Sequence, residues 1–279
     1  MQAMHKKDSS SRLKSALRIG RFLIPYRIYE SKGPQVVCVN GVQQSMAMWH
    51  TFVSRFSGKY RIALFDFPNQ GKAKIISGPA QVSLDEQVGI LAAVMEKAGV
   101  SKDAALCAAS WGGVVAAAFA SRYPERIKRL VLASLGTRAN EKMAETIKKG
   151  AVIDMRDRDQ MARVLLEAFG ENLPVRIKQK IFTQFRAMKE ENVRAFYEHG
   201  LFVVSSGKLS ELVNLKNIKA ETTLLYGERD TIIDLADVKF LASQIPNCRI
   251  RIVEGVGHFL HLESEAVFDL YADILGSSL

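Results

Sequence analysis

One local pattern restricts the fold of this chain more than any other: a strand, a tight turn and a helix follow one another around position 110. Residues 103–109 (DAALCAA) form a short apolar run typical of a strand buried on both faces. Residues 110–113 (SWGG) come next, and the alanine-rich stretch 114–123 is helical in pattern and ends at Pro124. The carboxyl end of a buried strand therefore carries a serine on a very short turn, which favours a layered sheet-and-helix fold.

Strand-like and helical segments alternate through most of the chain. An opening strand pair is predicted at residues 21–30, where Pro25 interrupts the pattern. Further strands are predicted at residues 35–40, 61–67, 127–135, 222–226 and 249–253. Helices are predicted at residues 48–56, 83–98, 238–244 and 262–275. Ser83 and Glu86 form the capping box of the second helix. We therefore expect an α/β fold with a mostly parallel central sheet and helices on both of its faces.

The pattern changes from about residue 136, where the chain becomes charged and helical in period without a strand. A helical block inserted between two strands of one sheet predicts a lid over an active site. The predicted division is a basic tail at residues 1–20, a core at residues 21–135 and 218–279, and a helical lid at residues 136–217.

The net charge of +10 fits either a solvated basic surface or an acidic partner. Anionic lipid and an acidic carrier protein are possible partners, whereas nucleic acid is not predicted because no recognised binding motif accompanies the charge. Basic residues crowd the first 21 positions, with Leu13 and Leu17 among them. A disordered tail is favoured there, and a short amphipathic helix in weak peripheral contact with a membrane is the alternative.

Composition also bears on location and cofactors. No apolar run approaches the ~20 residues needed to cross a bilayer, and the first residues lack the apolar segment of a secretory signal. A cytoplasmic location is therefore expected. Cys38, Cys107 and Cys248 lie in apolar, strand-like stretches and are expected to be reduced, buried thiols. Without a CxxC or histidine-rich cluster, no metal and no other cofactor is predicted.

Ser110 is the first candidate catalytic residue. A serine on so sharp a turn has a strained backbone, so the residues two positions away on either side must be small. Ala108 and Gly112 meet that demand, and the helix that begins at Trp111 places free N–H groups beside the hydroxyl. A serine that merely caps a helix would fit the same local pattern.

Two further segments supply the partners that a serine nucleophile needs, namely a base and a carboxylate that orients it. Residues 227–230 (GERD) follow one predicted strand, and residues 254–259 (EGVGHF) follow the next. Both segments fall at the carboxyl edge of the sheet, where α/β proteins place their ligands. The order serine, acid, histidine predicts Ser110 as nucleophile, Asp230 as acid and His258 as base.

Other residues compete for these roles. Glu228 and Asp234 flank the predicted acid, and His261 is an alternative base that is expected to begin the last helix. Cys107 lies inside a strand and is not expected to react. His199 lies in the predicted lid and is expected to border the pocket.

An oxyanion hole requires two N–H donors directed at the charge that develops during acyl transfer. The backbone N–H of Trp111 is one candidate, and that of Val42, in the turn after the first central strand, is the other. Asn40 and Phe259 are expected to border the same pocket. Asn40 and its neighbouring glycine would also suit a simple tight turn.

These residues together resemble the α/β-hydrolase superfamily from about residue 21 to the C-terminus. Most members carry His-Gly at the turn where this chain has Asn40 and Gly41. The segments VNG, LFDFP, SWGG and EGVGHFL resemble those of a narrower group within the superfamily. That group contains the rhamnolipid-precursor enzyme hydroxyacyloxy-alkanoate synthase and the hydroxyacyl carrier-protein:CoA transacylases.

The resemblance implies a function. Members of this group use the hydrolase triad to transfer β-hydroxyacyl chains from a thioester to another acceptor, so Ser110, Asp230 and His258 would be the triad. An acyl thioester of CoA or of an acidic acyl carrier protein would be the substrate. Hydrolysis of an ester, thioester or lactone is the alternative. A non-enzymatic binding protein is a third possibility, against which the intact triad argues.

Overall fold

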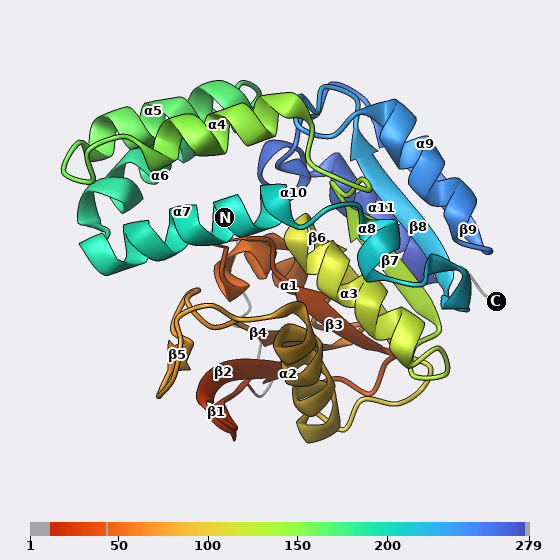
Figure 1. The fold of residues 1–279 in the computed structure, drawn as a ribbon. Helices are drawn as coiled ribbons and strands as arrows, with labels where there is room; N and C mark the ends of the chain where they lie inside the picture. Colours follow the sequence, from red (N-terminus) through yellow and green to blue (C-terminus); the bar gives the residue numbers. More distant parts are fainter. Residues whose placement is uncertain (1–11, 43, 277–279) are drawn as a thin grey trace, which may run out of the picture.

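The computed structural model describes residues 12–42 and 44–276, and these contain a nine-stranded sheet (Figure 1). The strand order is β1-β2-β4-β3-β6-β7-β8-β9, with β5 paired to β2. The strands are β1 Arg12–Ile19, β2 Phe22–Tyr29, β3 Gln35–Val39, β4 Arg61–Phe65, β5 Lys74–Ile75, β6 Ala105–Ala109, β7 Arg129–Ala133, β8 Glu221–Gly227 and β9 Cys248–Val253. Strands β3, β4, β6, β7, β8 and β9 pair in parallel, whereas β1, β2 and β5 pair antiparallel. The predicted α/β fold with a mostly parallel sheet is confirmed.

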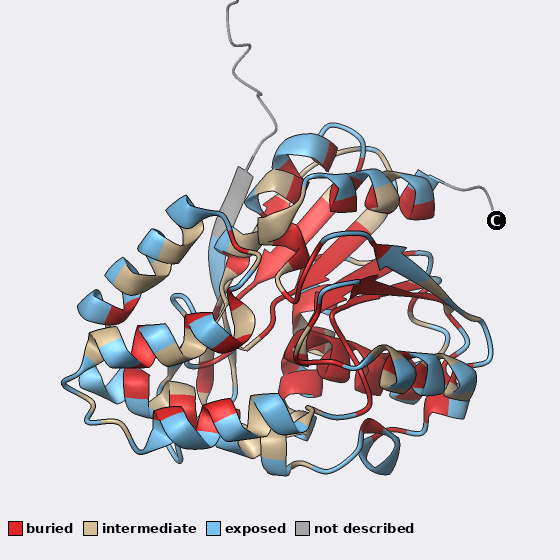
Figure 2. Cartoon of the chain, turned by 90° about the horizontal axis from the view of Figure 1, so that it is seen from above, coloured by how far each residue is buried: buried red, intermediate tan, exposed pale blue. Residues whose placement is uncertain are grey.

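Helices cover both faces of the sheet. Outside the region between β7 and β8, the helices are η1 Met46–Trp49, α1 His50–Phe56, α2 Leu84–Lys97, α3 Trp111–Arg122, α9 Leu235–Gln244, α10 Leu260–Glu263 and α11 Ala266–Gly276. Alternate residues of β3 point to opposite faces: Val37 packs with α2 and α3, whereas Cys38 packs with α1 and α11. Figure 2 shows the central strands almost wholly buried between these two helical layers.

The region between β7 and β8 is helical, as predicted, and is called here the helical insertion (residues 136–217). Its helices are α4 Glu141–Ala151, α5 Arg158–Phe169, α6 Val175–Ala187, α7 Glu190–Ser205, α8 Leu209–Leu212 and η2 Leu215–Asn217. A small core of its own includes Met161, Phe185 and Tyr197. The helices from α4 to α7 lie together at one end of the molecule (Figure 1).

The two ends of the helical insertion meet at Thr137. The Thr137 carbonyl accepts a hydrogen bond from the backbone N–H of Leu209, at 2.6 Å. The Thr137 backbone N–H and hydroxyl both donate to the carboxylate of Asp237, at the start of α9. The chain therefore leaves the core and returns to it at almost one point.

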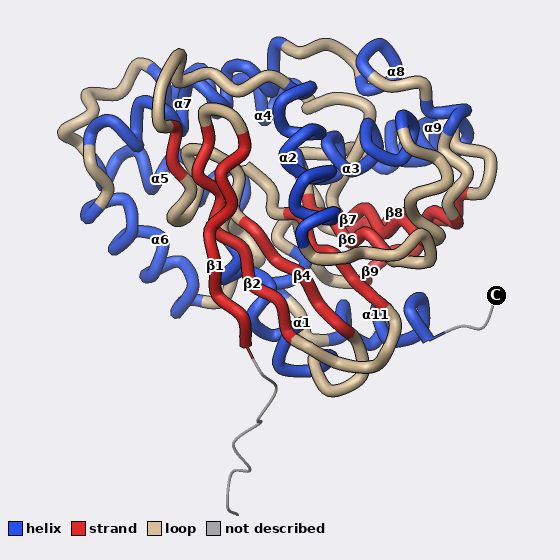
Figure 3. Tube along the Cα trace, turned by 90° about the horizontal axis from the view of Figure 1, so that it is seen from below, coloured by secondary structure: helices blue, strands red, loops and turns tan. Residues whose placement is uncertain are grey.

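The N-terminal boundary differs from the prediction. Part of the expected basic tail forms β1, which pairs antiparallel with β2 through a hairpin at Gly20, whose φ is +52° (Figure 3). The core therefore starts at Arg12 rather than at residue 21, and residues 12–19 are neither a tail nor a helix. Leu17 and Ile19, which are half-buried, pack against the main core, and the strand pairs with β2 along its whole length. Residues 1–11 lie outside the described part of the chain.

Other segments depart from the prediction only at their ends. The capping box of α2 is confirmed, since the Ser83 hydroxyl accepts from the Glu86 N–H while the Glu86 carboxylate accepts from the Ser83 N–H. Residues 21–30 form one strand, β2, and not a pair. The predicted last helix is divided into α10 and α11. The short strand β5 was not predicted. Within the described residues, no helix is long and apolar enough to span a membrane.

Candidate active site

Ser110 lies on the sharp turn between β6 and α3, with backbone angles φ 49° and ψ −125°. A positive φ is strained for any residue that has a Cβ. A hydrogen bond from the Ser110 N–H to the Ala133 carbonyl, at 2.8 Å, stabilises this conformation. A Cβ at Gly112 would lie 2.3 Å from the Asn40 carbonyl oxygen. Glycine is therefore required where the turn passes β3, and the local geometry is that of a nucleophile elbow.

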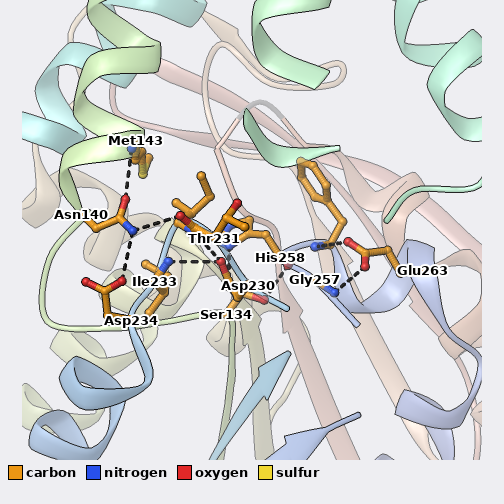
Figure 4. Close-up of polar contacts among 12 residues, drawn as sticks. Ser134, Asn140, Met143, Asp230, Thr231, Ile233, Asp234, Gly257, His258 and Glu263 are labelled. Atoms are coloured by element: carbon orange, nitrogen blue, oxygen red, sulfur yellow. Dashed lines mark hydrogen bonds and ion pairs between the residues drawn. The ribbon is translucent and has the colours of Figure 1, made fainter. Parts of the chain in front are cut away.

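Asp230 and His258 lie together at the carboxyl ends of β8 and β9 (Figure 4). One carboxylate oxygen of Asp230 is 2.8 Å from Nδ1 of His258. The other oxygen accepts from the N–H groups of Ile232 and Ile233, at 2.8 and 3.1 Å. Both oxygens of this buried carboxylate are thus engaged, and the imidazole has a fixed orientation.

The electrostatics of the pair favour a basic imidazole. Burial alone would raise the pKa of Asp230, but the charge and hydrogen bond of His258, with the two N–H donors, hold it below its ordinary value. Burial alone would lower the pKa of His258, but the Asp230 carboxylate raises it above the ordinary value, with a smaller contribution from Glu263. His258 is therefore a stronger base than a free imidazole.

Three hydrogen bonds hold the backbone of the loop that carries His258. The Glu263 carboxylate accepts from the N–H groups of Gly257 and Phe259, on either side of the histidine (Figure 4). The Ser134 hydroxyl donates to the His258 carbonyl at 2.6 Å. These contacts hold the backbone of the histidine while its ring contacts Asp230.

The loop that carries Asp230 is tied to the helical insertion. The Thr231 hydroxyl donates to the carbonyl of Ala168 in α5, at 2.9 Å. The side-chain amide of Asn140, the N-cap of α4, donates to the Thr231 carbonyl and to Asp234, at 3.0 and 3.2 Å. The insertion is thus anchored directly beside the predicted acid.

The competing residues have other partners. Glu228 accepts from the Gly255 N–H at 2.8 Å, and Asp234 is the N-cap residue of α9. His261 lies in α10, is buried, and its Nε2 is 2.9 Å from the Tyr271 hydroxyl. Cys107 is buried inside β6, where burial raises its pKa far above the range of a reactive thiol. The structure brings Asp230, and neither Glu228 nor Asp234, to His258.

An apolar cavity of about 300 Å³ has Ser110 and His258 in its wall, and is called here the acyl cavity. The core contributes Val42, Met48 and Phe259 among others. The insertion contributes apolar residues from four helices: Met143, Ile147, Leu165, Phe169, Ile177, Ile181, Phe185, Met188, Phe196, Gly200 and Val203. Among the described lining residues, Lys180 is the one lysine, arginine or carboxylate side chain. Such a cavity suits an aliphatic chain whose reactive end lies at Ser110.

Two predicted pocket residues lie elsewhere. The side chain of Asn40 is buried away from the acyl cavity, where its amide donates to the Phe65 carbonyl at 2.9 Å and its oxygen accepts from the Trp49 indole at 3.0 Å. His199 lines a separate cleft of about 640 Å³ on the other side of α7. Burial lowers the pKa of His199 to about 4, and its ring packs 5.8 Å from that of Trp111. Val42 and Phe259 do line the acyl cavity.

The sequence reasoning did not identify Glu263, Ser134 or the insertion residues of the cavity wall. Glu263 had a usable signal, because a carboxylate a few residues after a loop commonly accepts from that loop's N–H groups. Ser134 had none. Cys38 and Cys107 are buried and free as predicted, whereas Cys248 is only half-buried. Among the described residues, no three histidine, cysteine or carboxylate side chains gather as metal ligands would.

Comparison with known proteins places this geometry in a family. The family model described as the alpha/beta hydrolase fold matches residues 34–265. An (R)-3-hydroxydecanoyl-ACP:CoA transacylase of Pseudomonas aeruginosa is 22% identical over 260 residues, covering 92% of this chain and 86% of that protein. A pimeloyl-[acyl-carrier protein] methyl ester esterase of Aeromonas hydrophila is 25% identical over 246 residues, covering 81% and 89%.

Solved structures agree on the fold. The alpha/beta hydrolase enzyme MGS-M2 from a Medee basin deep-sea metagenome library superposes with a TM-score of 0.80 at 20% identity, covering 95% of this chain and 98% of that one. The enol-lactonase of Burkholderia xenovorans LB400 superposes with a TM-score of 0.77 at 19% identity, covering 94% and 100%. The chain belongs to the alpha/beta hydrolase fold family and is an enzyme of that fold.

Proposed function

We propose that the protein transfers acyl groups through a covalent intermediate on Ser110, with His258 as the base and Asp230 as its orienting acid. The observation that carries this proposal is the hydrogen-bonded Asp230–His258 pair, whose histidine shares the wall of the acyl cavity with the strained Ser110. A buried imidazole with a raised pKa is suited to take the serine proton. The backbone N–H groups of Val42 and Trp111 are the candidate oxyanion donors.

In the first half-reaction, Oγ of Ser110 attacks the carbonyl carbon of the acyl substrate while Nε2 of His258 takes the hydroxyl proton. The tetrahedral intermediate collapses as the bond to the leaving group breaks. His258 returns the proton to that leaving group, and the acyl chain stays on Ser110 with its tail in the acyl cavity. The helical insertion acts as the lid that excludes water from this cavity.

An acyl thioester is the substrate class that we favour. The acyl cavity is apolar and bordered by helices, as an aliphatic chain requires. Of the two relatives described above, one is an (R)-3-hydroxydecanoyl-ACP:CoA transacylase and the other is a pimeloyl-[acyl-carrier protein] methyl ester esterase. The net charge of +10 is compatible with an acidic carrier. The acceptor is a hydroxyl or a thiol.

Hydrolysis is the second candidate, and one observation favours it: one of the two relatives described above is an esterase, for which water is the acceptor. Both functions share the acyl-enzyme, so a Ser110 variant cannot separate them. Analysis of the products does separate them.

The test combines labelling with product analysis. A fluorophosphonate probe should label the wild-type protein and not Ser110→Ala, and labelling that persists in the variant would contradict the role of Ser110. The protein is then incubated with 3-hydroxyacyl-CoA and a second thiol, N-acetylcysteamine, as an acceptor, and the products are identified by mass spectrometry. An exchanged thioester or a dimeric hydroxyacyl ester indicates transfer, whereas free acid alone indicates hydrolysis.

A further inference from the structure

A second cavity also reaches Ser110 and His258. It has a volume of about 60 Å³ and is called here the rear passage. Its wall is built by the turn after β7, the amino-terminal part of α3 and the end of the insertion. Besides Ser110 and His258, its wall includes Leu135, Arg138, Met143, Ser206, Leu209 and Leu212. Ser110 and His258 therefore line both the acyl cavity and the rear passage.

The two cavities open in different places. Met143 and Val203 line both, so these two side chains separate them on the insertion side. Among the lining residues of the rear passage, Arg138, Gly207 and Leu212 are exposed, whereas the exposed lining residues of the acyl cavity are Ala47, Lys180 and Gln184. Each cavity thus has its own route to solvent.

In an acyl-enzyme, the presence of two cavities at Ser110 matters because the acyl chain occupies one of them. While the acyl chain is bound to Ser110 and fills the acyl cavity, the second nucleophile needs another approach to the ester carbonyl beside His258. We infer that the rear passage delivers this nucleophile, a neutral hydroxyl or thiol, to acylated Ser110. The inference rests on the proposed acyl-enzyme and assigns the acceptor site of the same reaction.

The size of the rear passage restricts the nucleophile. A volume of 60 Å³ corresponds to about two water molecules in the liquid. Side chains such as Leu135, Leu209 and Leu212 make much of its wall apolar. The passage therefore admits water or the hydroxyl or thiol end of an unbranched chain, and it excludes a second chain that is branched near its reactive end.

The delivered group reacts as follows. Its oxygen or sulfur attacks the carbonyl carbon of the Ser110 ester while Nε2 of His258 takes its proton. The bond from that carbon to Oγ then breaks, and His258 returns the proton to Oγ. A new ester, thioester or acid leaves, and Ser110 is free.

The test uses two adjacent serines at the end of α7. The hydroxyls of Ser205 and Ser206 both donate to the Phe202 carbonyl, at 3.1 and 2.5 Å, so either substitution removes a comparable contact. Ser206 lines the rear passage, whereas Ser205 lines the separate cleft that contains His199. Ser206→Trp should therefore obstruct the passage, and Ser205→Trp is its matched control. Leu212→Trp obstructs the exposed mouth without altering the core.

Acylation by a p-nitrophenyl ester and decay of the acyl-enzyme are measured separately, the first by stopped-flow absorbance and the second by intact-protein mass spectrometry. We expect Ser206→Trp and Leu212→Trp to slow decay about tenfold while acylation changes less than about twofold. Ser205→Trp should change neither rate. Decay is measured in buffer alone and with added N-acetylcysteamine, so that the two arms distinguish water from a thiol.

Slower decay in either arm supports the inference and identifies which nucleophile uses the passage. Unchanged decay in both arms overturns it, as does an equal loss of acylation and decay. If the wild-type protein forms no acyl-enzyme with the ester, the proposed function fails, and that result is distinct from both.

Discussion

The core and the helical insertion build the candidate site in different ways. In the core, Ser110, Asp230 and His258 are held by hydrogen bonds that involve the backbone: Ser110 lies on a strained turn, Asp230 accepts from two N–H groups, and the His258 loop contacts Glu263 and Ser134. The insertion contributes mainly apolar side chains from four helices and has a small core of its own. We therefore propose that the core carries out the reaction and that the insertion selects the substrate.

The largest expected effect lies in the core. Asp230→Asn keeps the shape of the acid but removes its charge, so turnover should fall about 10⁴-fold. Because Asp230 raises the pKa of His258, the acidic limb of the wild-type profile should lie above the ordinary imidazole value of about 6.5. In the variant this limb should move to lower pH. The measurement is the pH dependence of kcat/KM, and Glu228→Gln is the control that should retain turnover.

Glu263→Gln tests how strongly the histidine loop depends on its carboxylate. An amide offers one acceptor oxygen where the carboxylate offers two, so the N–H groups of Gly257 and Phe259 cannot both keep their partner. A displaced imidazole should lower kcat up to about a hundredfold with little change in KM. Steady-state kinetics with a neutral ester measure this. A change confined to KM would show that Glu263 acts on substrate binding instead.

Gly200→Ala tests whether the insertion determines which acyl chains the protein accepts. Gly200 lines the acyl cavity, and a Cβ there would lie 3.0 Å from Ile147, so the cavity should become narrower. Turnover of the longest acyl chains should fall about tenfold relative to short ones. The measurement is kcat/KM across a series of acyl lengths. Gly89→Ala in α2, where a Cβ would meet nothing within 4 Å, should leave the ratio unchanged.

The smallest expected effect concerns Lys180. Its exposed ammonium attracts an anionic substrate as it approaches the protein, so Lys180→Met should raise KM for an acyl-CoA about threefold and leave a neutral ester unaffected. Lys178 lies on the same helix, but its Nζ donates to the Glu171 carbonyl and it does not line the acyl cavity. Lys178→Met should therefore change neither KM. If both variants raise KM equally, the effect comes from the general surface charge and not from the position of Lys180.

The same contrast explains what the sequence could predict. Ser110 follows a predicted strand directly, and Asp230 and His258 lie in the short loops after two others, so the alternation of strands and helices was enough to bring them to one edge. The cavity wall could not be predicted in this way, because it depends on how four helices pack in space. The strand β1 was missed because its basic residues suggested a solvated tail, whereas in the structure it pairs with β2 and packs Leu17 and Ile19 against the core.

Asn40 shows that the position of a residue in the sequence does not determine the direction of its side chain. It lies at the turn where a pocket residue was expected, but the indole of Trp49 and the carbonyl of Phe65 hold its amide away from the cavity. His199 was assigned to the right segment but lies on the opposite side of α7 from the acyl cavity. Both errors concern the direction of a side chain, which distant parts of the chain determine.

The meeting of the insertion's two ends at Thr137 has a consequence for how this protein can change. Because Leu209 returns to the point where the chain left the core, a longer or shorter segment between them would close across the same short gap. The entropy of closing such a segment grows only slowly with its length. The helices between these two residues could thus be exchanged as a cassette, giving one reaction centre a succession of different substrates.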